Sequence, residues 1–241
     1  MTSSPPASSP PIASGPVSGS SKAHDLSHQA HRQLIGYLGI LLPLLLVGIA
    51  ALRPTPGLPR WEPLTSVSAY YYTGAVAAFV GILFALALFL FTYGGYRGYL
   101  ADRVVGKVGG FCALGVALFP TQAPGGLAEP SWWRGATMTI HYLSATSLFL
   151  VFIVFSLWLF RKTGVPEGGE LSPGKRQRNR VYLICGLVMV ANVLWAGSSY
   201  FTGAPIFWAE ILALWAFAVS WLVKGYAHRP VIDTVKGVLG R

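Results

Sequence analysis

Apolar residues fall into long runs along this chain, and the lengths of these runs decide the fold class. A helix rises about 1.5 Å per residue, so roughly 20 apolar residues cross the hydrocarbon core of a bilayer. Runs near that length cover Leu34–Leu52, Thr73–Tyr93, Ala136–Phe160, Val181–Tyr200 and Phe207–Val223. The pattern therefore predicts an all-α protein built from transmembrane helices.

A sixth apolar run, Val108–Phe119, is shorter than the other five and contains three glycines. At about 12 residues it is short for a crossing, so a re-entrant or interfacial segment is the alternative. If the run does cross, Arg103 and Lys107 reach back to the headgroups with their long side chains.

The distribution of lysine and arginine decides between six and five crossings, because cytoplasmic loops hold the excess of positive charge. With six crossings and the N-terminus inside, 15 of the 18 Lys and Arg residues lie on the cytoplasmic side. With five crossings, the basic stretch 161–180 would move outside, against this rule. We therefore predict a six-transmembrane-helix bundle with both termini in the cytoplasm.

The ends of the chain differ in composition from the apolar middle. The first 21 residues are mainly Ser, Pro, Gly and Ala, which bury too little apolar area to offset the entropy of ordering. We expect a disordered tail over residues 1–30, a membrane domain over 31–228 and a cytoplasmic tail over 229–241. The tail lacks the basic n-region of a signal peptide, so the first apolar run is expected to be a retained helix.

Composition agrees with a membrane protein and argues against nucleic-acid binding. Hydrophobic residues make up 53% of the chain and charged residues only 11%, against about 25% charged in soluble domains. The net charge of +10 comes without a zinc-finger, RNP-like or phosphate-loop motif. Basic residues beside the cytoplasmic leaflet instead attract anionic lipid. Cys112 and Cys185 lie far apart in apolar runs, where cysteine is usually a small apolar side chain.

Three consecutive tyrosines, Tyr70, Tyr71 and Tyr72, precede the second apolar run. Successive helical residues lie 100° apart, so the three rings fan around the end of a helix at the headgroup level. Other aromatic residues fall at the same predicted outer level: Trp61, Trp132, Trp133, Tyr200, Phe201 and Trp208. An aromatic belt is the plain interpretation, and the alternative is that some of these rings also wall a ligand pocket.

Three strongly polar residues lie within the apolar runs, and the predicted topology places all of them in the outer half of the membrane. These are His141, Asn192 and Glu210, roughly 5–9 Å deep at helical rise. They can simply lie in packing seams between helices, where polar side chains bond across the interface. Alternatively they form the polar floor of a pocket, in which Glu210 pairs with His141 and raises the basicity of its imidazole.

Neither a cofactor nor a metal ion is predicted. A haem would need further histidines inside the bundle, where His141 stands alone. His24, His28 and His31 precede the first apolar run at a spacing that could hold a metal ion. A solvated segment beside the membrane is the preferred interpretation of these three histidines.

Several short stretches carry a resemblance to a known group: "SVSAYYYT", "FTYGGYRG", "GVALFPT", "RNRVYLICG" and "SWLVKG". Over roughly residues 60–226 the chain resembles uncharacterised bacterial six-helix membrane proteins of a domain-of-unknown-function family. The resemblance implies a bacterial inner (cytoplasmic) membrane and transfers no catalytic residue. It also directs attention to the motif positions Pro120, Thr121, Arg180 and Lys224, besides the three tyrosines.

Our preferred functional hypothesis is non-catalytic binding of a lipid or another apolar molecule from the outer leaflet. The ligand-binding residues would be His141, Glu210, Asn192, Tyr70, Tyr71, Tyr72, Thr121, Trp132 and Trp133. The rival is an enzyme for a lipid-like substrate, with His141 as base and Glu210 as its partner, although no GxSxG or HExxH motif supplies a nucleophile or metal. A small transporter or assembly subunit is a third hypothesis. The lack of an internal repeat disfavours a transporter, although a homo-oligomer could supply the path.

Overall fold

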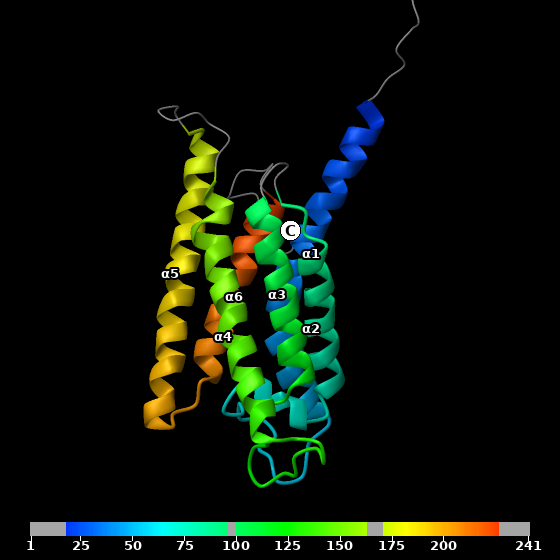
Figure 1. Ribbon diagram of the computed structural model, residues 1–241, viewed down its shortest axis with the longest axis vertical. Helices are drawn as coiled ribbons and strands as arrows, with labels where there is room; N and C mark the ends of the chain where they lie inside the picture. The colour runs from blue at the N-terminus through cyan, green and yellow to red at the C-terminus, as the bar shows by residue number, and fades with distance from the viewer. Residues whose placement is uncertain (1–17, 96–99, 163–170, 227–241) are drawn as a thin grey trace, which may run out of the picture.

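The computed structural model describes residues 18–95, 100–162 and 171–226, with the backbone alone for 18–28 and 200. This part of the chain is helical and has no strand. Its helices run up and down, each antiparallel to the next (Figure 1). The six α-helices are α1 (Ser18–Leu52), α2 (Val76–Phe91), α3 (Leu100–Leu118), α4 (Gly135–Leu157), α5 (Pro173–Thr202) and α6 (Phe207–Gly225). Two short 3₁₀ helices are η1 (Ser68–Tyr72) and η2 (Leu159–Arg161).

The helices form a closed bundle in which each packs against its neighbours in the chain and α6 returns to pack against α1. The connections between the helices lie at the two opposite ends of the bundle (Figure 1). We call the end that carries residues 53–75 and 119–134 the loop end. We call the opposite end, where the chain enters α1 and leaves α6, the basic end. Its basic residues with at least partly buried side chains are Arg32, Lys162, Lys175, Arg178 and Lys224.

Four helical stretches are long and apolar enough to cross a membrane: Gln29–Leu52, Gly135–Arg161, Pro173–Ser199 and Phe207–Gly225. A fifth helix, Val76–Phe91, is apolar but shorter. Phe207–Gly225 is by far the most buried of the four long stretches, whereas the others leave many large apolar side chains exposed. An apolar outer surface around a packed interior fits a bilayer as the surrounding solvent, so the predicted helical membrane protein is confirmed at this level.

The helices begin and end at places that differ from those the sequence predicted. The short run Val108–Phe119 is the second half of α3, which runs from the basic end to the loop end (Figure 1). The basic residues before Val181 already belong to the first turns of α5. Helix α1 begins at Ser18, so residues 18–30 of the tail that was predicted to be disordered are helical. The segments 1–17 and 229–241 lie outside the described residues.

The interior combines aromatic packing with a polar contact between helices. Phe152 of α4 stacks on Phe217 of α6 with ring centroids 3.6 Å apart. One helical turn further, the Ser156 hydroxyl donates to the Tyr182 carbonyl oxygen at 2.8 Å and lies 2.7 Å from the Ser220 hydroxyl. Because both buried hydroxyls have hydrogen-bond partners within the protein, they join α4, α5 and α6, and these bonds offset the cost of removing them from water.

Glycines let the backbones of α2 and α3 come close together. A Cβ added at Gly106 of α3 would lie 2.8 Å from the backbone oxygen of Leu90 in α2. At Gly81 of α2, nothing lies within 4 Å of an added Cβ. The seam between α2 and α3 therefore depends on the missing side chain at the first position and not at the second.

We expect Gly106→Ala to lower the melting temperature of the purified protein by several degrees, because its methyl group collides with a backbone atom that cannot move freely. Gly81→Ala is the matched control, since it gains the helix preference of alanine, about 1 kcal/mol, without a collision. Thermal unfolding in one detergent compares the two variants. Equal melting temperatures would show that the two helices are not packed as closely as described.

Candidate functional site at the loop end

A buried segment crosses the loop end and is held to α6 through its backbone. The backbone N–H groups of Ile206 and Phe207 both donate to the Thr65 carbonyl oxygen, at 2.8 and 3.1 Å. Two residues later, the Val67 N–H donates to Oε2 of Glu210 at 2.6 Å. This segment, residues 65–73, contains η1 and leads into α2. Glu210, in the first turn of α6, therefore serves as an acceptor for the segment.

His141 of α4 holds the same segment from the other side. Its side chain is 2% exposed. Nδ1 lies 2.6 Å from the Phe119 carbonyl oxygen, and Nε2 lies 2.9 Å from Oγ of Ser68. Because a carbonyl oxygen can only accept, Nδ1 carries the proton in this arrangement. The neutral imidazole then offers the lone pair of Nε2 to the hydroxyl of Ser68.

Ser68 is the functional candidate that the sequence did not point to. It lies at the start of η1 and is 8% exposed. A serine in a turn-rich segment is common, and no spacing relates it to a histidine 73 residues further along the chain. The fold alone brings the hydroxyl to the imidazole, so single-sequence reasoning had no signal to find this pair.

One of the two interpretations paired His141 with Glu210, and the structure contradicts that pairing. Neither is paired with the other within 4.0 Å in the described part of the chain; instead they bind the consecutive residues Ser68 and Val67. Asn192 does not join them either. Its amide nitrogen donates to the Val188 carbonyl of its own helix at 2.8 Å, as polar side chains within helices commonly do.

The three tyrosines are not a uniform belt. Tyr70 is 2% exposed, and its hydroxyl accepts from the Leu64 N–H at 3.5 Å. Tyr71 packs edge-on against Tyr72 and Phe79. The hydroxyl of Tyr72 donates to the Thr121 carbonyl at 2.6 Å. Burial, with help from the charges of Glu129 and Tyr71, raises the pKa of Tyr72 to about 12, so the phenol keeps its proton and remains a donor at neutral pH.

The other predicted site residues lie on the second segment of the loop end. The Thr121 hydroxyl donates to the Tyr142 hydroxyl at 3.4 Å, and Nε1 of Trp133 donates to the Pro120 carbonyl at 3.2 Å. Trp132 is half exposed. Thr121 and Trp133 therefore fix segment 119–134 against its surroundings, and Trp132 points outward, where an aromatic belt would place it.

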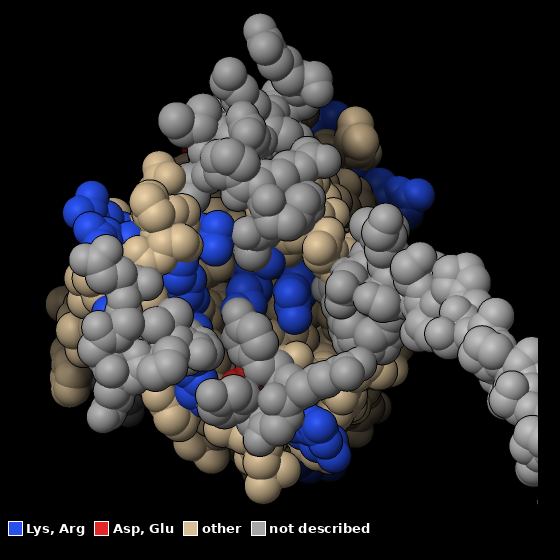
Figure 2. All heavy atoms as spheres, turned by 90° about the horizontal axis from the view of Figure 1, so that it is seen from above, with Lys and Arg blue, Asp and Glu red and all other residues tan. Residues whose placement is uncertain are grey.

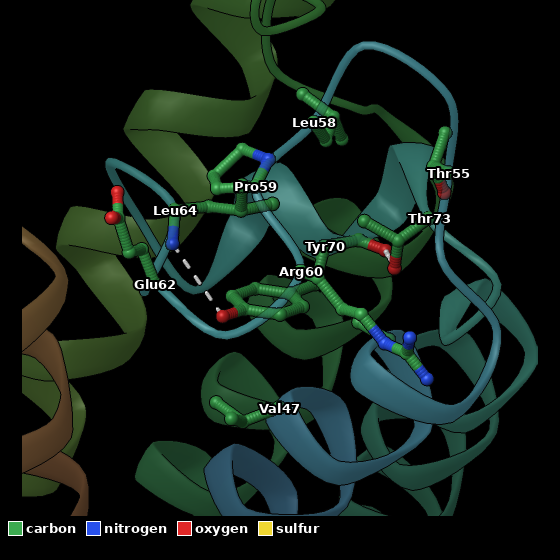
Figure 3. Close-up of a pocket in the computed structure, with 10 residues that line it drawn as sticks. Val47, Thr55, Leu58, Pro59, Arg60, Glu62, Leu64, Tyr70 and Thr73 are labelled. Carbon is green, nitrogen blue, oxygen red and sulfur yellow. Dashed lines mark hydrogen bonds between the residues drawn. The ribbon is translucent and has the colours of Figure 1, made fainter.

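A small pocket opens beside the buried segment (Figure 3). Apolar side chains of α1 and of residues 58–64 form part of its wall, and Arg60, Glu62 and Thr73 add polar groups. Of the predicted ligand residues, Tyr70 lines it. The free space accommodates about one water-sized molecule. An apolar ligand the size of a lipid chain therefore does not fit this pocket without movement of the segment.

Of the three histidines before the first apolar run, only His31 has a described side chain. The side chains of His24 and His28 lie outside the described residues. The His31 ring nitrogen Nε2 lies 2.7 Å from the Phe89 carbonyl oxygen, and the ring packs edge-on against Phe89. His31 therefore packs between α1 and α2. Within the described side chains, no three His, Cys, Asp or Glu residues are grouped closely enough to hold a metal ion.

No family model, curated protein or solved structure matches this chain. The functional argument therefore rests on the geometry of its own residues.

The hydrogen bond to Glu210 can be tested through the amide that it holds. We expect Glu210→Ala to speed hydrogen exchange of the Val67 amide, because the lost bond stabilises the segment by about 1–3 kcal/mol. Glu210→Gln keeps an acceptor oxygen and should change the exchange rate much less.

Glu62→Ala removes a carboxylate from the exposed part of the same end and serves as the control. Exchange measured by mass spectrometry on peptides covering 64–73 compares the three variants. An unchanged rate in Glu210→Ala would show that the segment is held without this carboxylate.

Proposed function

We propose that this chain is a six-span bacterial inner-membrane protein that cleaves an ester or amide bond of a lipid-like substrate. Ser68 is the nucleophile and His141 its general base. The basic end faces the cytoplasm with both termini, and the loop end faces the outer leaflet.

The course of the helices and the charge distribution support this topology. Helices α2 and α3 run between the same two ends as the four long apolar stretches (Figure 1). The basic residues gather at one end, which agrees with the excess of positive charge on the cytoplasmic side of membrane proteins. The bacterial inner membrane follows from the resemblance in sequence to six-helix proteins of that membrane.

One observation carries the proposed chemistry: Oγ of Ser68 lies 2.9 Å from Nε2 of His141, whose Nδ1 lies 2.6 Å from the Phe119 carbonyl. A hydroxyl, a base within hydrogen-bond reach and a third group that orients the base are the parts of an activated serine. Here a backbone carbonyl takes the place that a carboxylate holds in a Ser-His-Asp triad. A neutral dipole stabilises imidazolium less than a carboxylate does, so this base is weaker.

The reaction would proceed in two balanced steps. As Oγ of Ser68 bonds to the substrate carbonyl carbon, its proton passes to Nε2 of His141. The same proton then goes to the departing alcohol or amine as the carbon–oxygen or carbon–nitrogen bond breaks. Water attacks the acyl-serine with His141 again as base, which releases the acid and restores the hydroxyl.

Access to Ser68 requires the loop end to open, because both partners are buried. The pocket lined by Tyr70 offers the entrance (Figure 3), because Tyr70 follows the nucleophile by two residues along the chain. Its apolar wall includes Val47, Leu58 and Leu64. A wall of this kind favours substrates with an acyl chain that can approach from the surrounding lipid.

Binding of an apolar molecule without catalysis is the second candidate. The same apolar wall, next to Arg60 and Tyr70, supports it, because an apolar tail and a polar head would each meet a suitable surface. In this case the contact between Ser68 and His141 serves only to hold the segment in place.

A fluorophosphonate probe, which reacts with activated serines, tests the nucleophile. We expect labelling of the protein in native membranes, with the probe attached to Ser68. Ser68→Ala should abolish it, and His141→Ala should slow it by about 100-fold or more, in the range that a general base contributes.

Ser66→Ala is the matched control, since this hydroxyl lies in the same segment but binds the Ala69 N–H instead of a histidine. It should leave labelling unchanged. Absence of labelling with probes of short and long alkyl chains would refute the hydrolase. Mass spectrometry of co-purified lipid would then decide whether the protein is a binder.

A further inference from the structure

The basic end concentrates positive charge in a part of the bundle that is poorly exposed to water. Lys224, in the last turn of α6, is 3% exposed, and its ammonium lies 5.3 Å from the centre of the Phe160 ring. Lys175 of α5 donates from Nζ to the Phe160 carbonyl oxygen at 2.9 Å. Both lysines therefore converge on Phe160, where α4 passes into η2.

Two arginines complete this group. The charges of Arg32, Lys175 and Arg178 each act unfavourably on the Lys224 ammonium, so each of the three lies within electrostatic reach of Lys224. Nε of Arg32 is buried and has no hydrogen-bond partner among the described residues. Figure 2 shows lysine and arginine side chains gathered at the centre of this face of the molecule. A buried guanidinium nitrogen without an acceptor is costly unless an anion completes the site.

Among the side chains that the structure describes at this end, negative charge is scarce. Asp102 of α3 lies 3.6 Å from Nζ of Lys162 and acts favourably on Lys224. It is the one carboxylate at the basic end among the side chains that the structure describes, since Glu62, Glu129 and Glu210 belong to the loop end. One carboxylate cannot neutralise the five basic residues that are at least partly buried at this end, so the described side chains carry a surplus of positive charge there.

We infer that the basic end is a binding site for a phosphate group, held by Arg32, Lys175, Arg178 and Lys224. The phosphate belongs either to the headgroup of an anionic lipid or to a soluble phosphate compound. Guanidinium groups bind phosphate oxygens with paired hydrogen bonds, and lysines add point charges. The site is independent of the chemistry proposed for Ser68.

The basic residues at the start of α5 differ in exposure, and this difference distinguishes a specific site from a basic surface. Arg178 and Lys175 are partly buried, whereas Arg176 and Arg180 of the same turns are exposed. An exposed cation attracts anionic lipid by about 1 kcal/mol through the general field of the membrane surface. Phosphate binding at a specific site should therefore depend on Arg178 far more than on Arg180, although both residues carry the same charge on the same helix.

The test uses the full-length protein in nanodiscs of phosphatidylcholine, with and without phosphatidylglycerol. Native mass spectrometry counts retained phosphatidylglycerol, and thermal unfolding is measured with added inorganic phosphate or pyrophosphate. We expect retention of phosphatidylglycerol, or a rise in melting temperature with the soluble anions. Arg178→Gln and Arg32→Gln should each weaken the effect at least tenfold, whereas Arg180→Gln should leave it nearly unchanged.

The arms of this experiment separate the sources of the phosphate. Retained phosphatidylglycerol without an effect of the soluble anions assigns a lipid headgroup, and the reverse assigns a soluble compound. Equal losses in Arg178→Gln and Arg180→Gln would overturn the site, because only general surface attraction would remain. Binding that appears only after Asp25, Glu167, Glu170 and Asp233 are changed to amides would also overturn it, since the chain's own carboxylates would then occupy the cations.

Discussion

The contacts of His141 hold the loop end together. One ring nitrogen meets the backbone oxygen of Phe119, just beyond α3, and the other meets the hydroxyl of Ser68 before α2. A single side chain of α4 therefore fixes two separate connections of the bundle. In an apolar interior a nitrogen left without its partner costs about 1–3 kcal/mol. The adjacent anchor, Glu210 to the Val67 N–H, extends the same constraint to α6, so residues 65–73 are held from two helices at consecutive positions.

The contact between His141 and Ser68 has a structural role and, in the proposed function, a chemical one. Burial and two hydrogen bonds fix the position and the tautomer of the imidazole, which a general base requires. The same burial excludes a substrate from the closed structure. Opening the segment to admit a substrate would break the bonds of Val67 or Ser68, and that cost would be recovered only when a bound molecule restores the contacts. In the proposed function, retention of lipid and reactivity of Ser68 would therefore be two readouts of one opening equilibrium.

The sequence predicted the helices well and the site only in part, for a physical reason. Length and hydropathy identify helices because each apolar stretch must satisfy its own backbone in a bilayer. The same reasoning correctly placed His141 in the interior. Its partners, however, are a loop serine and a backbone carbonyl, and helical periodicity gives no information on the path of a loop. Asn192 was assigned to the site because it is polar and buried, yet its own helix already supplies an acceptor. Tyr72 and Thr121 do meet, but through the backbone oxygen of Thr121.

Helix α6 carries one ionisable side chain at each of its ends, and the two are too far apart to form an ion pair. Glu210 lies in its first turn and Lys224 in its last, the positions at which the helix dipole stabilises an acidic and a basic group respectively. At 1.5 Å per residue the two α-carbons are about 21 Å apart, well beyond the distance at which they could form an ion pair. Each charge must therefore be compensated at its own end. At the loop end a backbone N–H fulfils this role for Glu210. At the basic end, Asp102 acts favourably on Lys224, and the phosphate group proposed above would add to this compensation.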